Sequence, residues 1–570
     1  MKIENLCIQH FRGIEYSNIS FPSDTRMICL IGAGDSTKTT ILRAIEWVLW
    51  PAWNLYVSDN DFYNGDITRD IIIQGTFSEL PSTLLSDEKY GLFLRRNGVQ
   101  LDCGLDDEPK DGEPICLTIQ FTVDKSLEPK WEVVCNRKEP KNISYKDRKS
   151  MSIGSVGEKC DKDLMWGRYS ILQKYSDAKG ILQDAYTTAL REVACATDFR
   201  SLDDEISPTL LSLGHKYGVE FNNDIKNRMI MQNGSFSSAI GLFDGNAPLC
   251  QRGLGSQRLL SMGLNINVAS GDTLLLIDEV ENGLEPYRIC SLINEFRENH
   301  CDSGQIIMTT HSPVVVAECI ISELLVIQSI DGNTSAHRLK SGDEKSNRAM
   351  QAEVRKNAAA FLCKRLIVCE GKTEIGLIRA LDNFLARECN YRLSYKGIGT
   401  ANGDGSNIFK CADVLRSCGY KICLLMDSDL DGEENLKEDQ RTNNKISIFD
   451  WEKGNALEEQ VFKDIPITLA EQLLEIAIRE HGSASICFHL DSMKIPHSIQ
   501  DDNIKLSNPL PVKQEVIGTI AKRKKVEWYK RTDLGEALGN ILFSNWSMIN
   551  PDTKLRKTIM DLSAWVMKDD

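Results

Sequence analysis

The chain has 570 residues, of which 42% are apolar and 26% charged, and its 67 Lys and Arg against 82 Asp and Glu give a formal net charge of −15. This composition is typical of a globular protein of two to four domains, and the acidity argues against a polycationic nucleic-acid binder of the histone kind. Because no apolar run approaches the roughly 18–20 residues of a membrane span, no secretory segment is evident, and the 18 Cys form no C-x-x-C pair, we expect a cytoplasmic protein with reduced thiols and no membrane partner.

The first part of the chain alternates between predicted strands and predicted helices. Apolar spacing predicts a helix over Thr39–Trp50 and further helical structure over Asp161–Ala196. Strands are predicted over Lys2–Ile8, Arg26–Ile31 and Asp70–Phe77, over 117–123 and 131–135, and later over Leu274–Ile277, Ile306–Met308 and Glu323–Gln328.

A phosphate-binding loop is predicted between the second strand and the first helix. Gly32–Thr39 reads GAGDSTKT, close to the pattern G-x-x-x-x-G-K-[ST]. Backbone N–H groups and the helix N-terminus would face the phosphates of ATP, Lys38 would reach the β- and γ-phosphates, and Thr39 would hold Mg²⁺. The predicted nucleotide contacts are Gly32, Gly34, Asp35, Ser36, Thr37, Lys38, Thr39 and Thr40.

One residue of this loop departs from the pattern. Thr37 stands where the second Gly belongs, and a β-branched residue resists a positive φ. We therefore expect a distorted loop or weakened ATP turnover. The simpler alternative is an ordinary Gly-containing turn.

Later segments supply partners for this loop. Thr273–Glu279 reads TLLLIDE, an apolar strand ending in two acids, so that Asp278 would hold Mg²⁺ and Glu279 would polarise the attacking water. RGLGSQRLL precedes this strand, and IIMTTHSP follows it. The order resembles the ABC-type ATPase head shared by SMC and RecF-like proteins. The resemblance implies that Gly255 and Ser256 complete the ATP site of another subunit, that His311 contacts the γ-phosphate, and that Arg12 lies near the nucleotide.

Two further strands each end in carboxylates. RLIVCEGKTE places Glu370 at the end of a strand and Glu374 near the start of the next helix, and KICLLMDSD ends another strand with Asp427 and Asp429. Carboxyl ends of parallel strands meet at one edge of a sheet, where α/β folds place active sites. Hard cations prefer oxygen ligands, so these four acids predict a site for two Mg²⁺ or Mn²⁺ ions able to act on a phosphodiester.

This carboxylate pattern resembles a TOPRIM domain. The resemblance implies that KGIGTANGDG (396–405) is the turn after the second strand and that Glu458 is a further acid, with Glu459 as the neighbour that could replace it. The segment Ile520–Arg531 is basic, with Trp528 and Tyr529 interleaved, and predicts a DNA contact. One Lys there could stabilise the transition-state charge, Lys530 as first choice and Lys524 as second.

Together the motifs resemble the OLD (overcoming lysogenization defect) nuclease family. The fold expected is α/β: an ABC-type head (1–158 and 236–345) split by a helical dimerisation insert (159–235), a polar linker (346–362), and a TOPRIM domain with a helical C-terminal part (363–570). The resemblance implies an ATP-regulated, metal-dependent DNA endonuclease or nickase, a homodimer or an oligomer of dimers, and a role in anti-phage defence. Partners by the same resemblance are DNA and an operon-encoded helicase-like protein or retron reverse transcriptase with its nucleic acid.

Two other functions stay open. One is an ATP-driven DNA clamp or repair scaffold without nuclease activity. The other is a TOPRIM primase or topoisomerase, for which a nucleophilic Tyr in a DNA-gate domain is not apparent.

Overall fold

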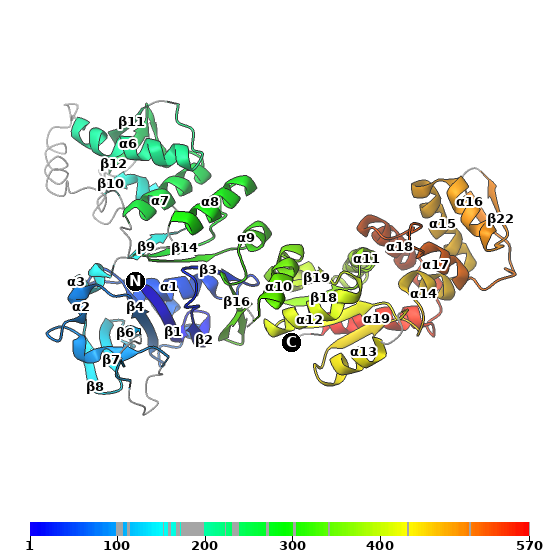
Figure 1. The fold of residues 1–570 in the computed structure, drawn as a ribbon, viewed down its shortest axis with the longest axis horizontal. Helices are drawn as coiled ribbons and strands as arrows, with labels where there is room; N and C mark the ends of the chain where they lie inside the picture. Colours follow the sequence, from blue (N-terminus) through cyan, green and yellow to red (C-terminus); the bar gives the residue numbers. More distant parts are fainter. Residues whose placement is uncertain are drawn as a thin grey trace. The chain divides into compact units, whose positions relative to one another are not determined.

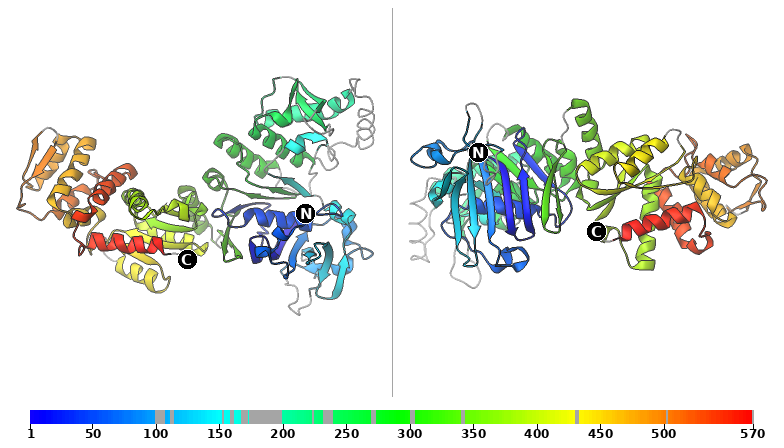
Figure 2. Two further views of the ribbon diagram at one scale, coloured as in Figure 1. Left: turned by 180° about the vertical axis from the view of Figure 1, so that it is seen from behind. Right: turned by 90° about the horizontal axis from the view of Figure 1, so that it is seen from below.

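The structure is a computed structural model that describes residues 1–98, 107–110, 114–151, 153–157, 161–166, 172, 199–222, 224–230, 239–268, 273–299, 304–339, 343–429, 433–500 and 503–568. The chain divides into two units, Met1–Gln351 and Ala352–Asp570, which are drawn in Figures 1 and 2.

The first unit is built on one large mixed sheet. Among the described residues it has 13 strands, in the order β8-β7-β6-β4-β1-β2-β17-β16-β3-β15-β14-β9, with β5 paired to β6. The strands are β1 (Lys2–Phe11), β2 (Ile14–Ser20), β3 (Met27–Ile31), β4 (Ile71–Ser78), β5 (Arg95–Arg96), β6 (Ile115–Val123), β7 (Pro129–Cys135), β8 (Lys138–Asn142), β9 (Ile153–Val156), β14 (Leu274–Ile277), β15 (Gln305–Thr309), β16 (Leu324–Ile330) and β17 (Asn333–Arg338).

The two halves of this sheet differ in the direction of their strands. The strands from β8 to β2 pair antiparallel, and those from β16 through β3, β15 and β14 to β9 pair parallel. The blue and cyan strands of the antiparallel half lie side by side in the right-hand view of Figure 2. Strands β3, β14 and β15 are buried along their whole length, as their apolar sequences predict for parallel strands.

Helices complete the first unit. Helix α1 packs on the sheet, because its buried face (Ile41, Ala44, Ile45 and Val48) shares a core with β1, β4 and β6 (Figure 1). The helices are α1 (Lys38–Val48), α2 (Ser82–Leu85), α3 (Tyr145–Ser150), α6 (Arg200–Lys216), α7 (Leu254–Val268), α8 (Pro286–Asn299), α9 (Pro313–Glu318) and α10 (Glu344–Lys356).

The insert predicted over 159–235 contributes helix α6 and two strands to a small sheet that continues into the segment after it. Strands β10 (Met165–Trp166), β11 (Ile225–Ile230) and β12 (Ala239–Asp244) pair antiparallel beside α6, and β13 (Ala247–Pro248) pairs with β12. Within the predicted insert, residues 159–235, the structure thus describes helix α6 with strands β10 and β11, and the role of this insert in dimerisation stays a prediction. Most of the predicted helix over Asp161–Ala196 lies outside the described residues.

The second unit begins with a four-stranded parallel sheet in the order β19-β18-β20-β21. Its strands are β18 (Arg365–Cys369), β19 (Ile398–Asn402), β20 (Lys421–Met426) and β21 (Ser447–Asp450). β18 is wholly buried, and β20 is buried after its first residue. The connecting helices are α11 (Lys372–Cys389), α12 (Ile408–Ser417) and α13 (Glu433–Thr442).

The rest of this unit is mainly helical and shares the core of the sheet. Ile367 and Leu425 of the sheet belong to one buried cluster with Leu473, Leu538 and Leu562 of the later helices, so the C-terminal part is not a separate domain. Its elements are α14 (Leu457–Asp464), α15 (Ile467–His481), α16 (Ser483–Ser492), β22 (His497–Gln500), β23 (Asn503–Leu506), α17 (Glu515–Ala521), α18 (Thr532–Ser544) and α19 (Lys554–Met567).

The polar stretch predicted as a linker, residues 346–362, is folded. Helix α10 occupies Glu344–Lys356, and a 3₁₀ turn follows at Ala360–Leu362. Val354 is buried, and the Gln351 side chain accepts from the N–H of Ile321 and donates to the carbonyl of Cys319. Few apolar positions suffice to hold such a helix, which is why its composition resembled a loop. Within the described residues, no helix has the length and apolarity of a membrane span.

Candidate functional site

The predicted phosphate loop connects β3 to α1, the strand–loop–helix arrangement expected of such a loop, although Thr37 replaces the second Gly. Thr37 adopts the left-handed conformation, φ 66° and ψ 13°, which costs an L-residue roughly 1–2 kcal/mol. Its hydroxyl donates to the Ser36 carbonyl at 2.6 Å and lies 3.0 Å from the Thr334 hydroxyl on β17. Asp35 in the same loop is also left-handed, φ 60°, so the loop carries backbone strain at two residues, and the contacts of the Thr37 hydroxyl help to stabilise it.

Lys38 is folded into this loop. Its ammonium donates to the carbonyls of Gly32 (3.0 Å) and Ala33 (2.7 Å) and to the Ser36 hydroxyl (3.1 Å). Burial lowers the pKa of Lys38 to about 8, against the opposing effect of nearby acidic groups such as Asp35 and Asp278. An ammonium with three weak acceptors is suited to exchange them for phosphate oxygens.

The Mg²⁺ ligands predicted for the nucleotide site are brought together, although they are 239 residues apart in the chain. The Thr39 hydroxyl donates to Asp278 Oδ1 at 3.0 Å, and the Thr309 hydroxyl donates to the same oxygen at 2.7 Å. Asp278 follows β14, and Thr309 ends the adjacent strand β15. A hydroxyl and a carboxylate side by side are oxygen ligands of the kind Mg²⁺ prefers.

The remaining head residues lie at the same edge of the sheet. Glu279 has a left-handed backbone, φ 48°, and its N–H donates to the Thr309 hydroxyl at 2.8 Å. His311 is exposed, and its N–H donates to Glu281 Oε1 at 2.6 Å. Glu281 was not among the predicted residues.

Gly255 and Ser256 lie in the first turn of α7. A Cβ at Gly255 would lie 2.2 Å from the carbonyl oxygen of Gly283, so only glycine allows this approach. Arg258, two residues beyond Ser256, is fully buried and donates to the carbonyls of Asp278 (2.6 Å) and Glu279 (2.7 Å). Arg258 therefore connects α7, which carries Gly255 and Ser256, to the end of β14. No local sequence pattern indicated this role.

Arg12 has a different partner. Its guanidinium forms an ion pair with Asp61 at 2.9 Å and lies over the rings of Phe11 and Trp47. The next residue lies close to the phosphate loop, because a Cβ at Gly13 would lie 3.4 Å from Cγ2 of Thr37, and the position of Arg12 near a nucleotide stays a prediction.

The second predicted site lies at the carboxyl edge of the parallel sheet in the second unit. Glu370 follows β18, Asp427 follows β20, and the Asp427 N–H donates to Glu370 Oε2 at 2.8 Å. The N–H of Leu457, at the start of α14, donates to Asp427 Oδ1 at 2.9 Å. The Gly-containing turn lies beside them, because the N–H of Gly405 donates to the Glu370 carbonyl at 2.8 Å.

Glu374 and Glu458 belong to the same buried group of acids. Burial, followed by the charges of Glu458 and Glu370, raises the pKa of Glu374 to about 8. Burial also raises the pKa of Asp427 strongly, with the charges of Glu374, Glu370 and Glu458 acting in the same direction. The pKa values of Glu370 and Glu458 are raised by burial as well. Glu374 and Glu458 are buried, and Glu370 and Asp427 are partly buried. Because their ionised forms are disfavoured, a positive charge bound among these four carboxyl groups would stabilise them.

The donor chemistry of this group fits a hard divalent cation, although the side chains do not converge on one point. Carboxylate oxygens are preferred ligands of Mg²⁺ and Mn²⁺. Within the part of the chain that the structure describes, no three His, Cys, Asp or Glu side chains stand at the spacing of a bound metal. The oxygens are instead engaged by backbone N–H groups, such as that of Gly371 on Glu374 at 2.8 Å.

Asp429 lies near these acids, since its charge raises the pKa of Glu370 and Asp427, and it is paired with a lysine. Lys522, which follows α17, lies 3.2 Å from Asp429 and 2.5 Å from Glu459. Glu459 also accepts the Ala456 N–H at 3.0 Å, which caps the start of α14. Glu459 is thus engaged in capping and ion pairing, and Glu458 is the member of the pair that acts electrostatically on Glu374.

Two lysines act on the acids, and the sequence predicted only one of them, Lys530. Lys437 on α13 is fully buried and donates to the Asp427 carbonyl (3.0 Å) and the Ser428 hydroxyl (2.8 Å), which fixes the turn after β20. Lys530, the predicted stabiliser, is half-exposed and forms an ion pair with Glu527 at 3.7 Å. Its charge still opposes the burial effect on the pKa of Glu370 and Glu458.

The expectation that aromatic rings interleave the basic segment at a DNA surface is wrong. Trp528 and Tyr529 are fully buried, and the Tyr529 hydroxyl donates to the Leu473 carbonyl at 2.9 Å. They belong to the core that holds this segment, so base stacking on them is excluded.

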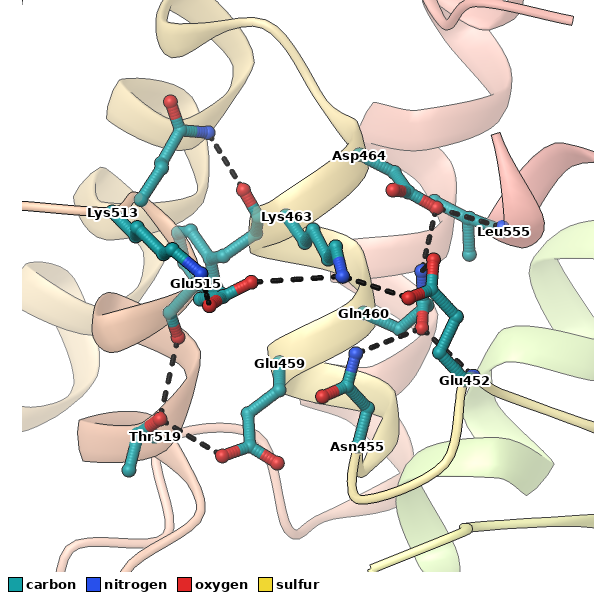
Figure 3. Close-up of polar contacts among 12 residues, drawn as sticks. Glu452, Asn455, Glu459, Gln460, Lys463, Asp464, Lys513, Glu515, Thr519 and Leu555 are labelled. Carbon is teal, nitrogen blue, oxygen red and sulfur yellow. Dashed lines mark hydrogen bonds and ion pairs between the residues drawn. The ribbon is translucent and has the colours of Figure 1, made fainter. Parts of the chain in front are cut away.

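Helix α14, which carries Glu458, is fixed by a polar network (Figure 3). Gln460 is fully buried, accepts the N–H of Glu452 at 3.0 Å and donates to Asp464 at 2.8 Å. Lys463 bridges Glu452 and Glu515, at 2.7 and 3.8 Å. This network sets the position of α14 against its neighbours.

Comparison with known proteins identifies the modules. Residues 1–201 match a family model described as an AAA ATPase domain, and residues 202–317 match one described as an AAA domain, putative AbiEii toxin, Type IV TA system. Residues 361–429 match the model of the overcoming lysogenization defect protein-like TOPRIM domain. No curated protein matches the chain.

Three of the similar solved structures are SMC heads, each 14% identical to this chain. One is the SmcHead bound to the C-winged helix domain of ScpA, which covers 61% of this chain and 100% of that chain with a TM-score of 0.39. Another is the Smc head domain with an extended coiled coil bound to the C-terminal domain of ScpA from Pyrococcus furiosus (62% and 99%, TM-score 0.35). A third is the SMC head domain from Thermotoga maritima (60% and 100%, TM-score 0.30).

Proposed function

The chain has the domain composition of an OLD-family ATPase–TOPRIM fusion, and from this premise we propose that this nuclease-type ATPase is an ATP-regulated, divalent-metal-dependent DNA endonuclease or nickase. The observation that carries the proposal is the meeting of Glu370, Asp427, Glu374 and Glu458 at one sheet edge, where burial raises the pKa of each and the neighbouring acids raise the pKa of Glu374 and Asp427 further.

The roles of the acids follow from their positions. Glu370 and Asp427, joined by the 2.8 Å hydrogen bond, and the buried Glu374 and Glu458 would hold Mg²⁺ or Mn²⁺. A bound ion would supply Lewis acidity toward a phosphodiester oxygen and lower the pKa of a ligated water. Lys437 fixes the Asp427 turn, and the Gln460 network fixes the helix that carries Glu458, so the protein holds these groups in place before any ligand arrives.

The head residues support ATP binding and its regulation of cleavage. Lys38 would contact the phosphates, Thr39 and Asp278 would hold the nucleotide Mg²⁺, and Glu279 would orient the attacking water. Gly255 and Ser256 would complete the ATP site of a second copy, which makes a homodimer or an oligomer of dimers part of the proposal. An anti-phage role with an operon-encoded helicase-like or retron partner rests on the family resemblance alone.

The test is cleavage of supercoiled and linear DNA with Mg²⁺ or Mn²⁺, with and without ATP. We expect nicked or linear product with the wild-type protein and none with Glu370→Ala or Asp427→Ala, because each change removes a carboxylate from the cluster. Both variants should retain ATP affinity, since the ATP residues belong to the other unit. Full cleavage by either variant would exclude this site.

One rival function is favoured by a specific observation. The absence of three acids at metal spacing in the described residues is what an ATP-driven DNA clamp without nuclease activity would show. Such a protein would bind DNA with ATP and leave it intact under all metal conditions. A topoisomerase role is disfavoured for Tyr529, which is buried and hydrogen-bonded, and primer synthesis from NTPs would identify a primase.

A further inference from the structure

The Lys522 ammonium lies between two carboxylates, those of Asp429 and Glu459, beside the carboxylate cluster. Its ammonium lies 2.5 Å from Glu459 Oε2 and 3.2 Å from Asp429 Oδ2, and its side chain is 24% exposed. One ammonium thus partly neutralises two carboxylates, one of which, Asp429, was predicted to bind metal.

The position of Lys522 is built into the packing of two helices. A Cβ at Gly518 would lie 2.5 Å from the Glu458 carbonyl oxygen, so the backbones of α17 and α14 are in direct contact. The Thr519 hydroxyl donates to Glu459 Oε1 at 2.8 Å (Figure 3). Lys522 comes one residue after α17 and is therefore presented to Glu459 by a rigid support.

Asp429 differs from the other predicted ligands in what it contacts. Glu370, Glu374 and Asp427 each accept a backbone N–H, which leaves their charge in place and lone pairs free for a metal ion. Asp429 instead has a full positive charge at 3.2 Å. A divalent ion bound to Asp429 would have to replace this ammonium, because two cations at one carboxylate oxygen repel each other.

We propose that Lys522 is an internal counter-ion that withholds Asp429 from divalent metal, so that the first ion binds at Glu370 and Asp427 and a second is admitted only when the Lys522 pair with Asp429 opens. This inference rests on the proposed metal site. Lys522 would thereby set the metal concentration at which the second position fills, and would keep the acids compatible with folding when metal is scarce.

The test is Mn²⁺ binding to the full-length protein, without DNA or nucleotide, by calorimetry and by the EPR signal of free Mn²⁺. Lys522→Met keeps an unbranched side chain of similar length and removes the charge. We expect it to tighten the weaker Mn²⁺ site roughly five- to tenfold, the effect of removing a partly exposed competing ion pair. Lys522→Arg, which keeps the charge, should stay within about twofold of wild type.

Matched controls separate this effect from a general change of charge. Lys463 lies on α14, the helix of Glu459, and bridges Glu452 and Glu515. Lys463→Met therefore removes a nearby lysine that does not pair with Asp429, and it should leave Mn²⁺ affinity unchanged. In an Asp429→Asn background, Lys522→Met should have no further effect, since the carboxylate it competes for is gone. Lys522→Gln serves in place of Lys522→Met if the latter fails to fold.

The outcomes are distinct from those that test the nuclease itself. If the wild-type protein binds no Mn²⁺, or if Glu370→Gln and Asp427→Asn bind it as well as wild type, the proposed metal site fails. If wild type binds Mn²⁺ through those acids but the neutral Lys522 variant binds equally or more weakly, the counter-ion role is refuted while the metal site stands.

Discussion

Replacing Glu374 by Gln should stabilise the metal-free protein at neutral and alkaline pH. Glu374 is 4% exposed, and burial followed by the charge of Glu458 raises its pKa from 4.5 to about 8. Gln has nearly the same shape, and its carbonyl oxygen can still accept the Gly371 N–H that Glu374 accepts. The change therefore removes the ionisable group and keeps the local hydrogen bond.

The magnitude follows from proton linkage. Because the folded protein holds this proton more tightly than the unfolded chain, folding takes up a proton between the two pKa values, and stability falls as the pH rises from about 4.5 towards 8. At pH 7.5 the cost is about 4 kcal/mol relative to strongly acidic solution, and at pH 5.5 about 1 kcal/mol. Glu374→Gln should recover most of this cost, which corresponds to roughly 8–16 °C in the midpoint of a unit of this size at pH 7.5.

The assay is thermal unfolding followed by calorimetry in EDTA at pH 5.5 and 7.5, with Glu452→Gln as a control. Glu452 lies in the same unit and pairs with Lys463 at 2.7 Å, which lowers its pKa, so its loss should not stabilise the protein. Added Mn²⁺ should stabilise wild type more than Glu374→Gln. A lower midpoint for Glu374→Gln at pH 7.5, or an equal gain at both pH values, would refute the reasoning.

Three further predictions concern the ATP head. ATP affinity should weaken as the pH rises above about 8, because burial lowers the pKa of Lys38 to about 8 and only its ammonium form attracts phosphates. Calorimetry at pH 7 and pH 9 tests this. The Lys38→Met variant should lose both the ATP affinity and its pH dependence. Gly255→Ala should destabilise the head by about 1–3 kcal/mol in urea unfolding and abolish any ATP-dependent dimer seen by light scattering, because the added Cβ meets the Gly283 carbonyl at 2.2 Å. Thr37→Gly should raise the rate of ATP hydrolysis several-fold with little change in stability, since relief of the left-handed strain is offset by the freedom of Gly in the unfolded chain; a slower rate would contradict this account of the loop.

Strand ends could be predicted because the buried parallel strands have a simple signature. Leu274–Ile277 matches β14 residue for residue, and β18 begins at Arg365 as expected. A short, wholly apolar segment predicts a buried parallel strand, and the acid that directly follows it then lies at the edge of the sheet. This is why the positions of Asp278, Glu370 and Asp427 could be predicted. The order of strands in a βαβ sheet then brings such edges together.

Side chains whose role depends on helix packing could not be predicted in this way. Trp528 and Tyr529 looked like surface residues beside lysines, yet they are buried. Residues 346–362, predicted as a linker, do contain the boundary between the two units, yet Val354 anchors a helix there that the polar composition did not indicate. In both cases a few contacts from distant segments outweigh the local composition.

The sequence by itself determined which motifs exist and which strand ends carry acids, because those depend on local apolar runs and on turn residues next to them. Only the tertiary structure decided what neutralises and positions those acids. Lys437, Lys522 and Arg258 reach their partners across 9 to 93 residues of chain, through the packing of α13, α17 and α7. A long cationic side chain takes its partner from whatever helix packing brings within a few ångströms, and that proximity has no local signature in the sequence.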